Sequence, residues 1–158
     1  VYSKLGLGTT FAVYLPADSG NATPDTAVKM EARFRGNGET ILVVDDEDSV
    51  RQVTRAVLAA LNFTVLTAAD GTEALIKVAE HRAELRAVIT DLHMPHMDGL
   101  SFVRVLRLML PQAGVIVASG RMEEREEKEF KALGVSAILD KPYTQGKLVE
   151  ALKTVFQK

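Results

Sequence analysis

Residues 40–48 have the sequence TILVVDDED, a short run of apolar and β-branched residues that leads directly into four acidic ones. A run of this length and composition predicts a strand that is buried on both faces of a sheet. Four further runs have the same character and are separated by longer segments. The five predicted strands are 40–44, 63–67, 87–90, 115–118 and 137–139.

The segments between these strands have the apolar periodicity of helices. Asp48 or Ser49 is predicted to cap the first helix. Its predicted apolar face consists of Val50, Val53, Val57, Leu58 and Leu61. Asp70 and Glu73 have the spacing of a capping box at the start of the second helix, which extends to about residue 79. The other three predicted helices are 99–110, 123–133 and 144–156.

Short strands that alternate with helices predict an α/β domain built on a parallel sheet. The connections between parallel strands are right-handed crossovers, which place helices against the sheet. Residues 39–158 are long enough for one such domain with three layers.

The composition fits a globular chain and excludes several functional classes. Apolar residues make up 47% of the 158 residues and charged residues 25%, which argues against wholesale disorder. The formal net charge of −2 does not indicate a general nucleic-acid or membrane binder. The absence of cysteine excludes disulfides, thiolate zinc sites, iron–sulfur clusters and cysteine catalysis, and it is compatible with a reducing cytoplasm.

The sequence also lacks a membrane signal. No apolar run approaches the roughly 18–20 residues needed to cross a bilayer, and no signal peptide opens the chain. We therefore expect a cytoplasmic location and no membrane contact by this chain. The first residue is Val1 and not Met, which indicates a fragment of a larger parent, with processing as the alternative. A membrane anchor elsewhere in such a parent is compatible with this expectation.

Polar side chains follow four of the predicted strands, and the carboxyl ends of parallel strands meet at one edge of a sheet. These side chains are Asp45 and Asp46 after the first strand, Asp91 after the third, Ser119 after the fourth and Lys141 after the fifth. Close carboxylates repel one another unless a cation offsets their charge, and carboxylate oxygens favour Mg²⁺. An aspartate beside Mg²⁺ and a lysine is a plausible nucleophile for phosphoryl transfer, because both cations offset charge on the incoming group.

Four segments resemble the receiver domain of two-component response regulators. They are Val43–Glu47 (VVDDE), Asp91–Gly99 (DLHMPHMDG), Ala118–Gly120 (ASG) and Lys141–Tyr143 (KPY). Their order and spacing agree with this family over residues 40–158. The resemblance implies a flavodoxin-like fold with five parallel strands in the order 2-1-3-4-5 and helices on both faces. In folds with this strand order the site lies between the first and third strands.

The resemblance implies a phosphorelay function with Mg²⁺ as the cofactor. Asp91 would accept a phosphoryl group from a histidine kinase or a histidine phosphotransfer domain, and no nucleic acid partner is implied. Asp46 and Asp91 would ligate Mg²⁺ directly, Asp45 would act mainly through a bound water, and the backbone carbonyl of His93 would be a further ligand. The chain would only assist its own phosphorylation and dephosphorylation.

The resemblance also assigns roles at the last two strand ends. Lys141 would pair with the phosphoryl oxygens, and Ser119 would hydrogen-bond the phosphoryl group and draw its loop inward. The Lys141–Pro142 bond is expected to be cis. Three residues before the lysine, where receivers usually carry Tyr or Phe, this chain has Ile138. This departure leaves open a second hypothesis, an interaction module that keeps the fold but signals without phosphorylation.

Two other chemistries are less favoured by the residues. An acid-phosphatase-like hydrolase would need a second acid two residues after Asp91, where this chain has His93. His93 and His96 have a spacing that suggests a metal pair, but they lie on a predicted loop without a cysteine or a third histidine beside them, which disfavours zinc.

The charged run at 123–131 is predicted to be a solvated helix face. It is supported by pairs at helical spacing such as Glu124–Lys128 and Glu127–Lys131. The alternative is a surface that docks a partner.

The first sixteen residues resemble a second family. Gly6–Pro16 (GLGTTFAVYLP) is similar to the end of a histidine kinase ATP-binding domain, where a Gly-rich segment precedes the last strand, predicted here at 9–15. Most of that domain would be absent, so no ATP binding is expected. The predicted organisation is a kinase remnant (1–16), a linker (17–38) and a receiver domain (39–158), which implies the C-terminal part of a hybrid sensor histidine kinase.

Overall fold

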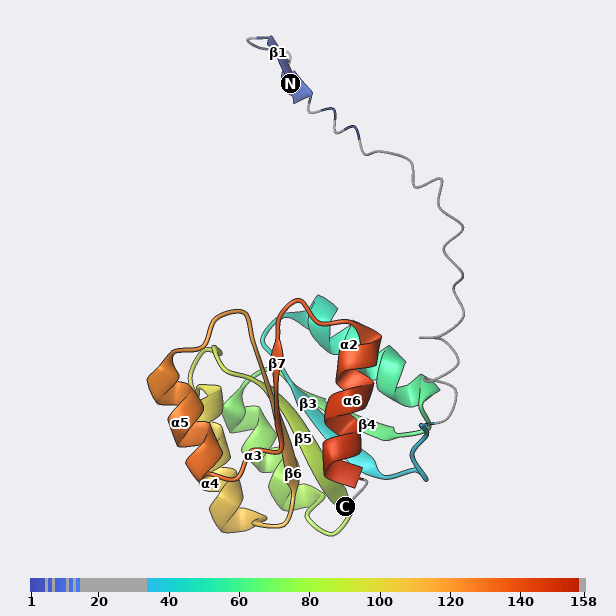
Figure 1. The fold of residues 1–158 in the computed structure, drawn as a ribbon, viewed down its shortest axis with the longest axis vertical. Helices are drawn as coiled ribbons and strands as arrows, with labels where there is room; N and C mark the ends of the chain where they lie inside the picture. The colour runs from blue at the N-terminus through green and yellow to red at the C-terminus, as the bar shows by residue number, and fades with distance from the viewer. Residues whose placement is uncertain (5, 7, 11, 13, 15–33, 157–158) are drawn as a thin grey trace.

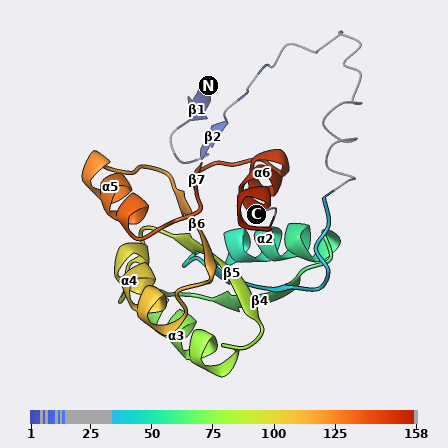
Figure 2. The same ribbon diagram turned by 60° about the horizontal axis from the view of Figure 1, so that its bottom comes forward.

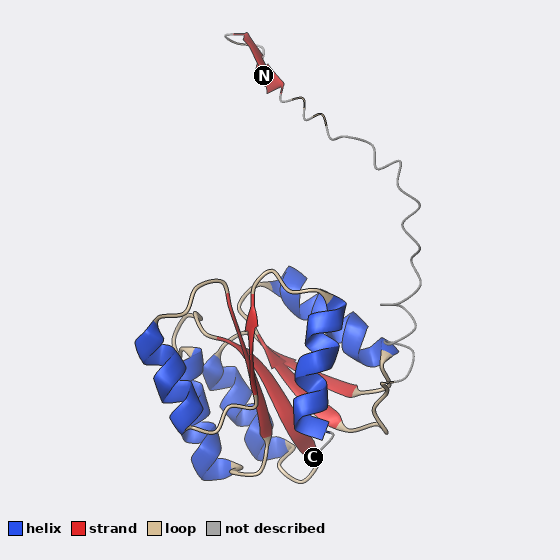
Figure 3. Ribbon diagram, viewed as in Figure 1, coloured by secondary structure: helices blue, strands red, loops and turns tan. Residues whose placement is uncertain are grey.

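The computed structural model describes residues 1–4, 6, 8–10, 12, 14 and 34–156. Within residues 34–156 a parallel sheet of five strands lies between two layers of helices (Figures 1 and 3). The strands are β3 (Thr40–Val44), β4 (Thr64–Ala68), β5 (Leu85–Asp91), β6 (Gly114–Ser119) and β7 (Ala137–Asp140). Their order across the sheet is β4-β3-β5-β6-β7, and every neighbouring pair is parallel. This order is the expected 2-1-3-4-5, which confirms the predicted fold.

The helices divide between the two faces of the sheet. They are α2 (Asp48–Ala60), α3 (Gly71–Glu80), α4 (Gly99–Met109), α5 (Glu124–Ala132) and α6 (Gln145–Phe156). α2 and α6 cover one face, and α3, α4 and α5 cover the other (Figure 2). None of the described helices has the length and apolarity to span a bilayer.

The central position of β3 explains why its residues 41–44 are all apolar. All five of its residues are buried. Ile41 and Val43 belong to the apolar cluster beneath α2 and α6, whereas Leu42 and Val44 belong to the cluster beneath α3, α4 and α5. Side chains alternate between the faces of a strand, so a strand covered on both sides needs apolar residues at every position.

The start of α2 differs from the prediction. Its N-cap residue is Glu47, and no side chain caps the first turn. The carboxylate of Asp48 instead accepts a hydrogen bond from Arg51 Nη2 at 3.0 Å. The hydroxyl of Ser49 donates to Glu47 Oε1 at 2.5 Å. Both predicted cap residues therefore bind side chains and not the backbone of the first turn.

Val53 does not belong to the buried face of α2, as the periodicity predicts, but is 66% exposed. Residues along a helix are about 100° apart, so the direction of the buried face decides which residues at its edge are covered. Thr54 and Leu58 are buried against the sheet side, and Val53 lies just outside this face.

The predicted cap of α3 is present with one difference. Glu73 donates its backbone N–H to Asp70 Oδ1 at 2.8 Å. The Glu73 carboxylate in turn accepts from the backbone N–H of Ala69 at 2.8 Å, where a standard capping box would use that of Asp70. The pair therefore caps the helix, with the reciprocal bond shifted by one residue.

The N-terminal residues that the structure describes form a short hairpin. β1 (Tyr2–Lys4) pairs antiparallel with β2 (Gly8–Thr10). Of the strand predicted at 9–15, only the first two residues lie in β2, and Ala12 and Tyr14 are not in a strand. The other residues of this prediction, Phe11, Val13 and Leu15, lie outside the described residues.

The end of the predicted linker packs against the domain. Residues 17–33 lie outside the described residues, but Phe34 is 7% exposed and its ring centroid is 6.1 Å from that of Phe63. The backbone N–H of Gly36 donates to the Leu61 carbonyl at 2.8 Å. The packed unit therefore includes Phe34, upstream of the boundary expected at residue 39.

The charged run forms the outer face of α5. The Nζ atom of Lys128 lies 4.0 Å from Glu124 Oε2, and that of Lys131 lies 2.5 Å from Glu127 Oε1. Both predicted pairs are therefore confirmed. Glu129 contacts Arg104 of α4, so one acid of this run links two helices.

Candidate functional site

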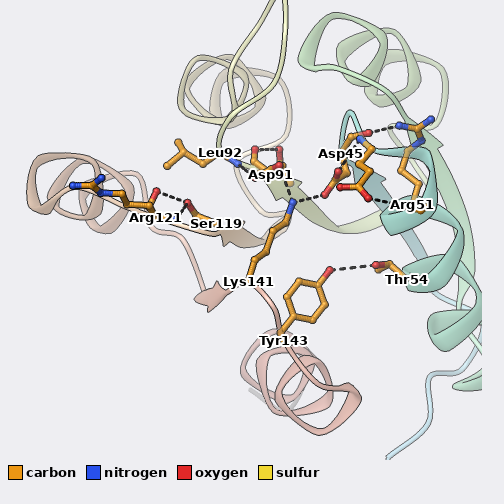
Figure 4. A network of polar contacts seen from close by, with 12 residues as sticks. Asp45, Arg51, Thr54, Asp91, Leu92, Ser119, Arg121, Lys141 and Tyr143 are labelled. Atoms are coloured by element: carbon orange, nitrogen blue, oxygen red, sulfur yellow. Dashed lines mark hydrogen bonds and ion pairs between the residues drawn. The ribbon is translucent and has the colours of Figure 1, made fainter. Parts of the chain in front are cut away.

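The fold brings four strand ends to one edge of the sheet, as the sequence predicts. Asp45 directly follows β3, and Asp91 ends the neighbouring strand β5. Ser119 ends β6, and Lys141 directly follows β7. Figure 4 shows the side chain of Lys141 extending from its own strand end across to the two aspartates.

Lys141 connects both aspartates through its ammonium group. Its Nζ atom donates to Asp45 Oδ2 at 2.6 Å and to Asp91 Oδ2 at 2.7 Å. The three side chains are largely withdrawn from water, with exposed fractions of 22% for Lys141, 5% for Asp45 and 12% for Asp91. The ammonium thus holds together two carboxylates that would otherwise repel each other.

The two ends of this contact respond differently to burial. Burial lowers the pKa of Lys141, but the hydrogen bonds to Asp45 and Asp91 and the negative charges of these two residues together outweigh this effect, so the pKa is raised overall. Burial raises the pKa of Asp45, and the hydrogen bond from Lys141 offsets only part of the increase. The pKa of Asp45 remains raised because its carboxylate is the more deeply buried partner.

Asp46 completes a cluster of three carboxylates. One oxygen each from Asp45, Asp46 and Asp91 lies within 4.8 Å of the others. Asp46 is exposed, and its side chain makes no hydrogen bond or ion pair with any described residue. A set of hard oxygen donors that is open to water on one side fits Mg²⁺, which prefers oxygen ligands and keeps several waters.

The backbone that follows Asp91 holds its carboxylate in place. Asp91 Oδ1 accepts a hydrogen bond from the N–H of Leu92 at 2.7 Å. The N–H of Gly99, at the start of α4, donates to the Leu92 carbonyl at 2.9 Å. A Cβ atom on Gly99 would lie 2.1 Å from the Asp91 carbonyl oxygen, so the chain needs glycine at this position.

Ser119 reaches the site edge but binds its own loop. Its Oγ atom donates to the carbonyl of Arg121 at 2.6 Å and accepts from the Arg121 N–H at 3.2 Å (Figure 4). The residue is 3% exposed. The structure therefore shows no hydrogen bond between Ser119 and Asp91.

The two histidines after Asp91 do not join the acidic cluster. The side chains of His93 and His96 are exposed. Among residues 34–156, the candidate metal cluster contains aspartates and no histidine, which gives no support to a zinc pair. His93 lies in the loop that follows β5, as its expected role as a carbonyl ligand requires.

An apolar groove lies next to Lys141 between α2 and the turn that follows β7. It has a volume of about 450 Å³ and is lined by Ser49, Val50, Val53, Thr54, Lys141, Pro142 and Tyr143. The hydroxyls of two of these residues, Tyr143 and Thr54, are 3.2 Å apart and form a hydrogen bond (Figure 4). The Lys141–Pro142 bond is cis, as expected. The prediction that Val53 belongs to the core is therefore wrong: its exposed side chain lines this groove.

Sequence reasoning missed one basic residue at the site, Arg51. Its guanidinium donates to the backbone carbonyl of Asp45 (Figure 4). It also donates to the carboxylate of Asp48. The available signal was its position one helical turn after the acidic run, which directs a long side chain back toward the start of the helix.

The comparison with known families agrees with this geometry. Residues 41–153 match the response regulator receiver domain. The chain belongs to this family. Receiver domains act in two-component phosphorelay signalling, in which they interact with kinases or phosphotransfer proteins that donate the phosphoryl group.

Two sensor proteins are similar to nearly the whole chain. The sensor kinase CckA of Brucella abortus is 32% identical over 164 residues, which cover 99% of this chain and 17% of that protein. The sensor protein EvgS of Escherichia coli is 29% identical over 153 residues, which cover 96% of this chain and 12% of that protein. The chain thus spans less than a fifth of either relative.

A solved structure shares the fold of the receiver domain. In the CheX–CheY–BeF3–Mg+2 complex from Borrelia burgdorferi, the matching chain has a TM-score of 0.70 and 31% identity. The match covers 76% of this chain and 90% of that chain.

Proposed function

We propose that this receiver domain accepts a phosphoryl group from a phosphohistidine onto Asp91, with Mg²⁺ as its cofactor. The observation that carries this proposal is the contact of the Lys141 ammonium with Asp45 and Asp91, at the edge where Asp46 also lies. Asp46 and Asp91 would hold Mg²⁺ directly, Asp45 through a water, and the backbone carbonyl of His93 would add a ligand. The similar CheX–CheY–BeF3–Mg+2 complex supports the same chemistry.

The proposed reaction is a displacement at phosphorus. An oxygen of the Asp91 carboxylate forms a new bond to phosphorus while the bond from phosphorus to the donor imidazole breaks, and the imidazole leaves with the electron pair. Bound Mg²⁺ would offset the negative charge of the carboxylates and the phosphoryl oxygens. Lys141 would exchange its bond to Asp91 for one to a phosphoryl oxygen. Ser119 would bind the group after its hydroxyl leaves the Arg121 carbonyl.

The donor domain would dock over α2. Its imidazole must reach Asp91 from the open edge of the sheet, and the apolar groove beside Lys141 lies at this edge. Val53 offers an exposed apolar side chain there. A Val53→Glu variant is expected to slow transfer from a protein donor while labelling by acetyl phosphate continues at the rate of the unaltered chain.

The parent would be a hybrid sensor histidine kinase that acts in the cytoplasm and carries this receiver domain after its kinase core. The similarity to CckA and EvgS over nearly the whole chain supports this context. In this proposal residues 1–16 are the end of the kinase ATP-binding domain, 17–38 a linker whose last residues from Phe34 on pack against the domain, and 39–158 the receiver domain.

A rival function is an interaction module that signals without phosphorylation. The observation that favours it is Ile138, which is half-buried on β7 where receivers usually carry an aromatic ring. The intact cluster of acids and Lys141 favours phosphorylation, because a module without this chemistry has no need to hold three carboxylates together.

Labelling of the chain with acetyl phosphate and Mg²⁺ tests the proposed function. Mass spectrometry is expected to show one added phosphoryl group, which Asp91→Asn abolishes. Asp140→Asn is the matched control, because Asp140 is an exposed aspartate at the same edge of the sheet and is expected to leave labelling intact. Failure of the unaltered chain to be labelled would favour the interaction module.

A further inference from the structure

Arg51 lies beside the acidic cluster without being one of its members. Its Nη1 atom donates to the backbone carbonyl of Asp45, and its Nη2 atom donates to Asp48 Oδ1 at 3.0 Å. The Arg51 side chain is 15% exposed, whereas that of Asp48 is 74% exposed. The contact with the Asp45 carbonyl is therefore the sheltered one, and the contact with Asp48 is open to water.

The bond from Arg51 completes the polar contacts of Asp45. The backbone N–H of Asp45 donates to the Ala68 carbonyl at 3.2 Å. Its two carboxylate oxygens accept from the N–H of Glu47 at 3.0 Å and from Lys141 at 2.6 Å. With its carbonyl bound to Arg51, every polar group of Asp45 has a partner.

Asp46 has the opposite environment. Its carboxylate is exposed and makes no contact with a described side chain that would aim it at the cluster. The Asp45 carbonyl and the nitrogen and Cα of Asp46 lie in one rigid plane, because they belong to the same peptide unit. A partner that holds this carbonyl therefore fixes the direction in which Asp46 leaves the strand.

We propose that Arg51 is a positioning residue for the divalent cation, because it holds the peptide between Asp45 and Asp46 and thereby aims the Asp46 carboxylate. Asp48 keeps the guanidinium in place from the solvent side. The inference rests on the proposed function, because it gives Asp46 its role as a Mg²⁺ ligand. Groups that orient metal ligands from outside typically contribute about 10- to 100-fold to metal affinity.

Replacement of Arg51 has two opposing effects on Mg²⁺ affinity, one through its charge and one through its hydrogen bond to the Asp45 carbonyl, and the test must separate them. Loss of a positive charge near three carboxylates would by itself favour a cation, which opposes the effect of a misaligned Asp46. The double variant D48N/R51M removes one charge of each sign and leaves the net charge of the chain unchanged. D48N alone keeps the bond to the Asp45 carbonyl.

Calorimetric titration of the full chain with Mg²⁺ tests the inference without any phosphoryl donor. D48N/R51M is expected to bind Mg²⁺ about 10-fold more weakly than the unaltered chain, and D48N within about twofold of it. R51K keeps a charged donor for the same carbonyl and is expected to recover most of the affinity. R55M, which removes an exposed arginine of the same helix, is expected not to weaken binding.

The outcomes distinguish the role of Arg51 from the proposed Mg²⁺ site. An affinity of D48N/R51M within twofold of that of the unaltered chain would overturn the role of Arg51 and leave the proposed function intact. The role of Arg51 would also be overturned if R55M weakened Mg²⁺ binding as much as D48N/R51M does. Absence of Mg²⁺ binding by the unaltered chain would overturn both the metal site and the role of Arg51.

Discussion

A half-buried cation lies at each end of the sheet, and the two have different partners. At the carboxyl edge, Lys141 donates to the carboxylates of Asp45 and Asp91. At the opposite edge, Arg107 in the last turn of α4 donates to backbone carbonyls and, within residues 34–156, to no side chain. Its acceptors are Leu133 at 2.7 Å, Ala113 at 2.6 Å, Gly134 at 2.8 Å and Pro111 at 3.2 Å.

The difference separates a site from a structural clamp. Carboxylates can exchange a lysine for a metal ion or a phosphoryl group, because their charge attracts any cation. The carbonyls around Arg107 are fixed by the chain, and they lie where α4 and α5 end and need donors. The pKa values follow the same division, because burial lowers the pKa of Arg107, while the acidic partners of Lys141 raise its pKa.

Replacement of Arg107 is expected to have the largest effect on stability. Arg107→Met leaves four carbonyl groups without their donor, and we expect the free energy of unfolding to fall by about 3 kcal/mol. Urea unfolding measures this loss, and Asp91 should still be labelled by acetyl phosphate in the folded variant. A loss below about 1 kcal/mol would remove the distinction between the two ends.

Replacement of Lys141 is expected to have a smaller effect that depends on the metal. Lys141→Met leaves two largely buried carboxylates without their cation, so without divalent ions we expect a loss of about 1–2 kcal/mol. Saturating Mg²⁺ should restore most of this loss but none of the loss in Arg107→Met. Lys147→Met, at an exposed lysine of α6, is the control. If Mg²⁺ did not reduce the stability loss of Lys141→Met, the idea that a metal ion can replace Lys141 as the partner of Asp45 and Asp91 would be contradicted.

The double variant Arg107→Met with Lys141→Met tests whether the two ends are independent. The residues share no partner, so we expect the two losses to add within about 0.5 kcal/mol. Urea unfolding without divalent ions provides the comparison. A larger deviation would mean that the two edges are coupled through the sheet, and the contrast between site and clamp would need revision.

The ion pair of Glu127 and Lys131 on α5 is exposed, so its loss is expected to have the smallest effect on stability. The hydrogen bond and charge of Lys131 hold the pKa of Glu127 below its ordinary value. Because the folded-state pKa is depressed, the pair stabilises the fold above the unfolded-state pKa of Glu127, and this contribution is lost as the pH falls through the folded-state value. An NMR titration of Lys131→Met should show the pKa of Glu127 rising toward its ordinary value, and Lys128→Met should raise it less.

The sequence was sufficient for the strands and for the residues at their ends. Buried parallel strands such as β3 are mostly apolar, and a parallel sheet brings Asp45, Asp91 and Lys141 to one edge in any such fold. The prediction of the acidic cluster therefore needed only the order of the elements. The expected roles of these residues as ligands and acceptor stay predictions.

The contacts of long basic side chains were not predictable in the same way. Arg51 and Arg107 bind backbone carbonyls, which every residue carries, so the sequence contains no partner that identifies these bonds. The exposure of Val53 and the burial of Phe34 depend on how α2 and residues 34–38 lie against neighbouring elements, which helical periodicity does not specify.

Gly99 leaves the first turn of α4 in direct contact with the backbone of Asp91. Any larger residue would have to push aside either the helix or the strand that carries Asp91. One methyl group at position 99 would therefore displace either α4 or Asp91 while leaving every charge of the site in place, so a single uncharged substitution could perturb this carboxylate by steric means alone.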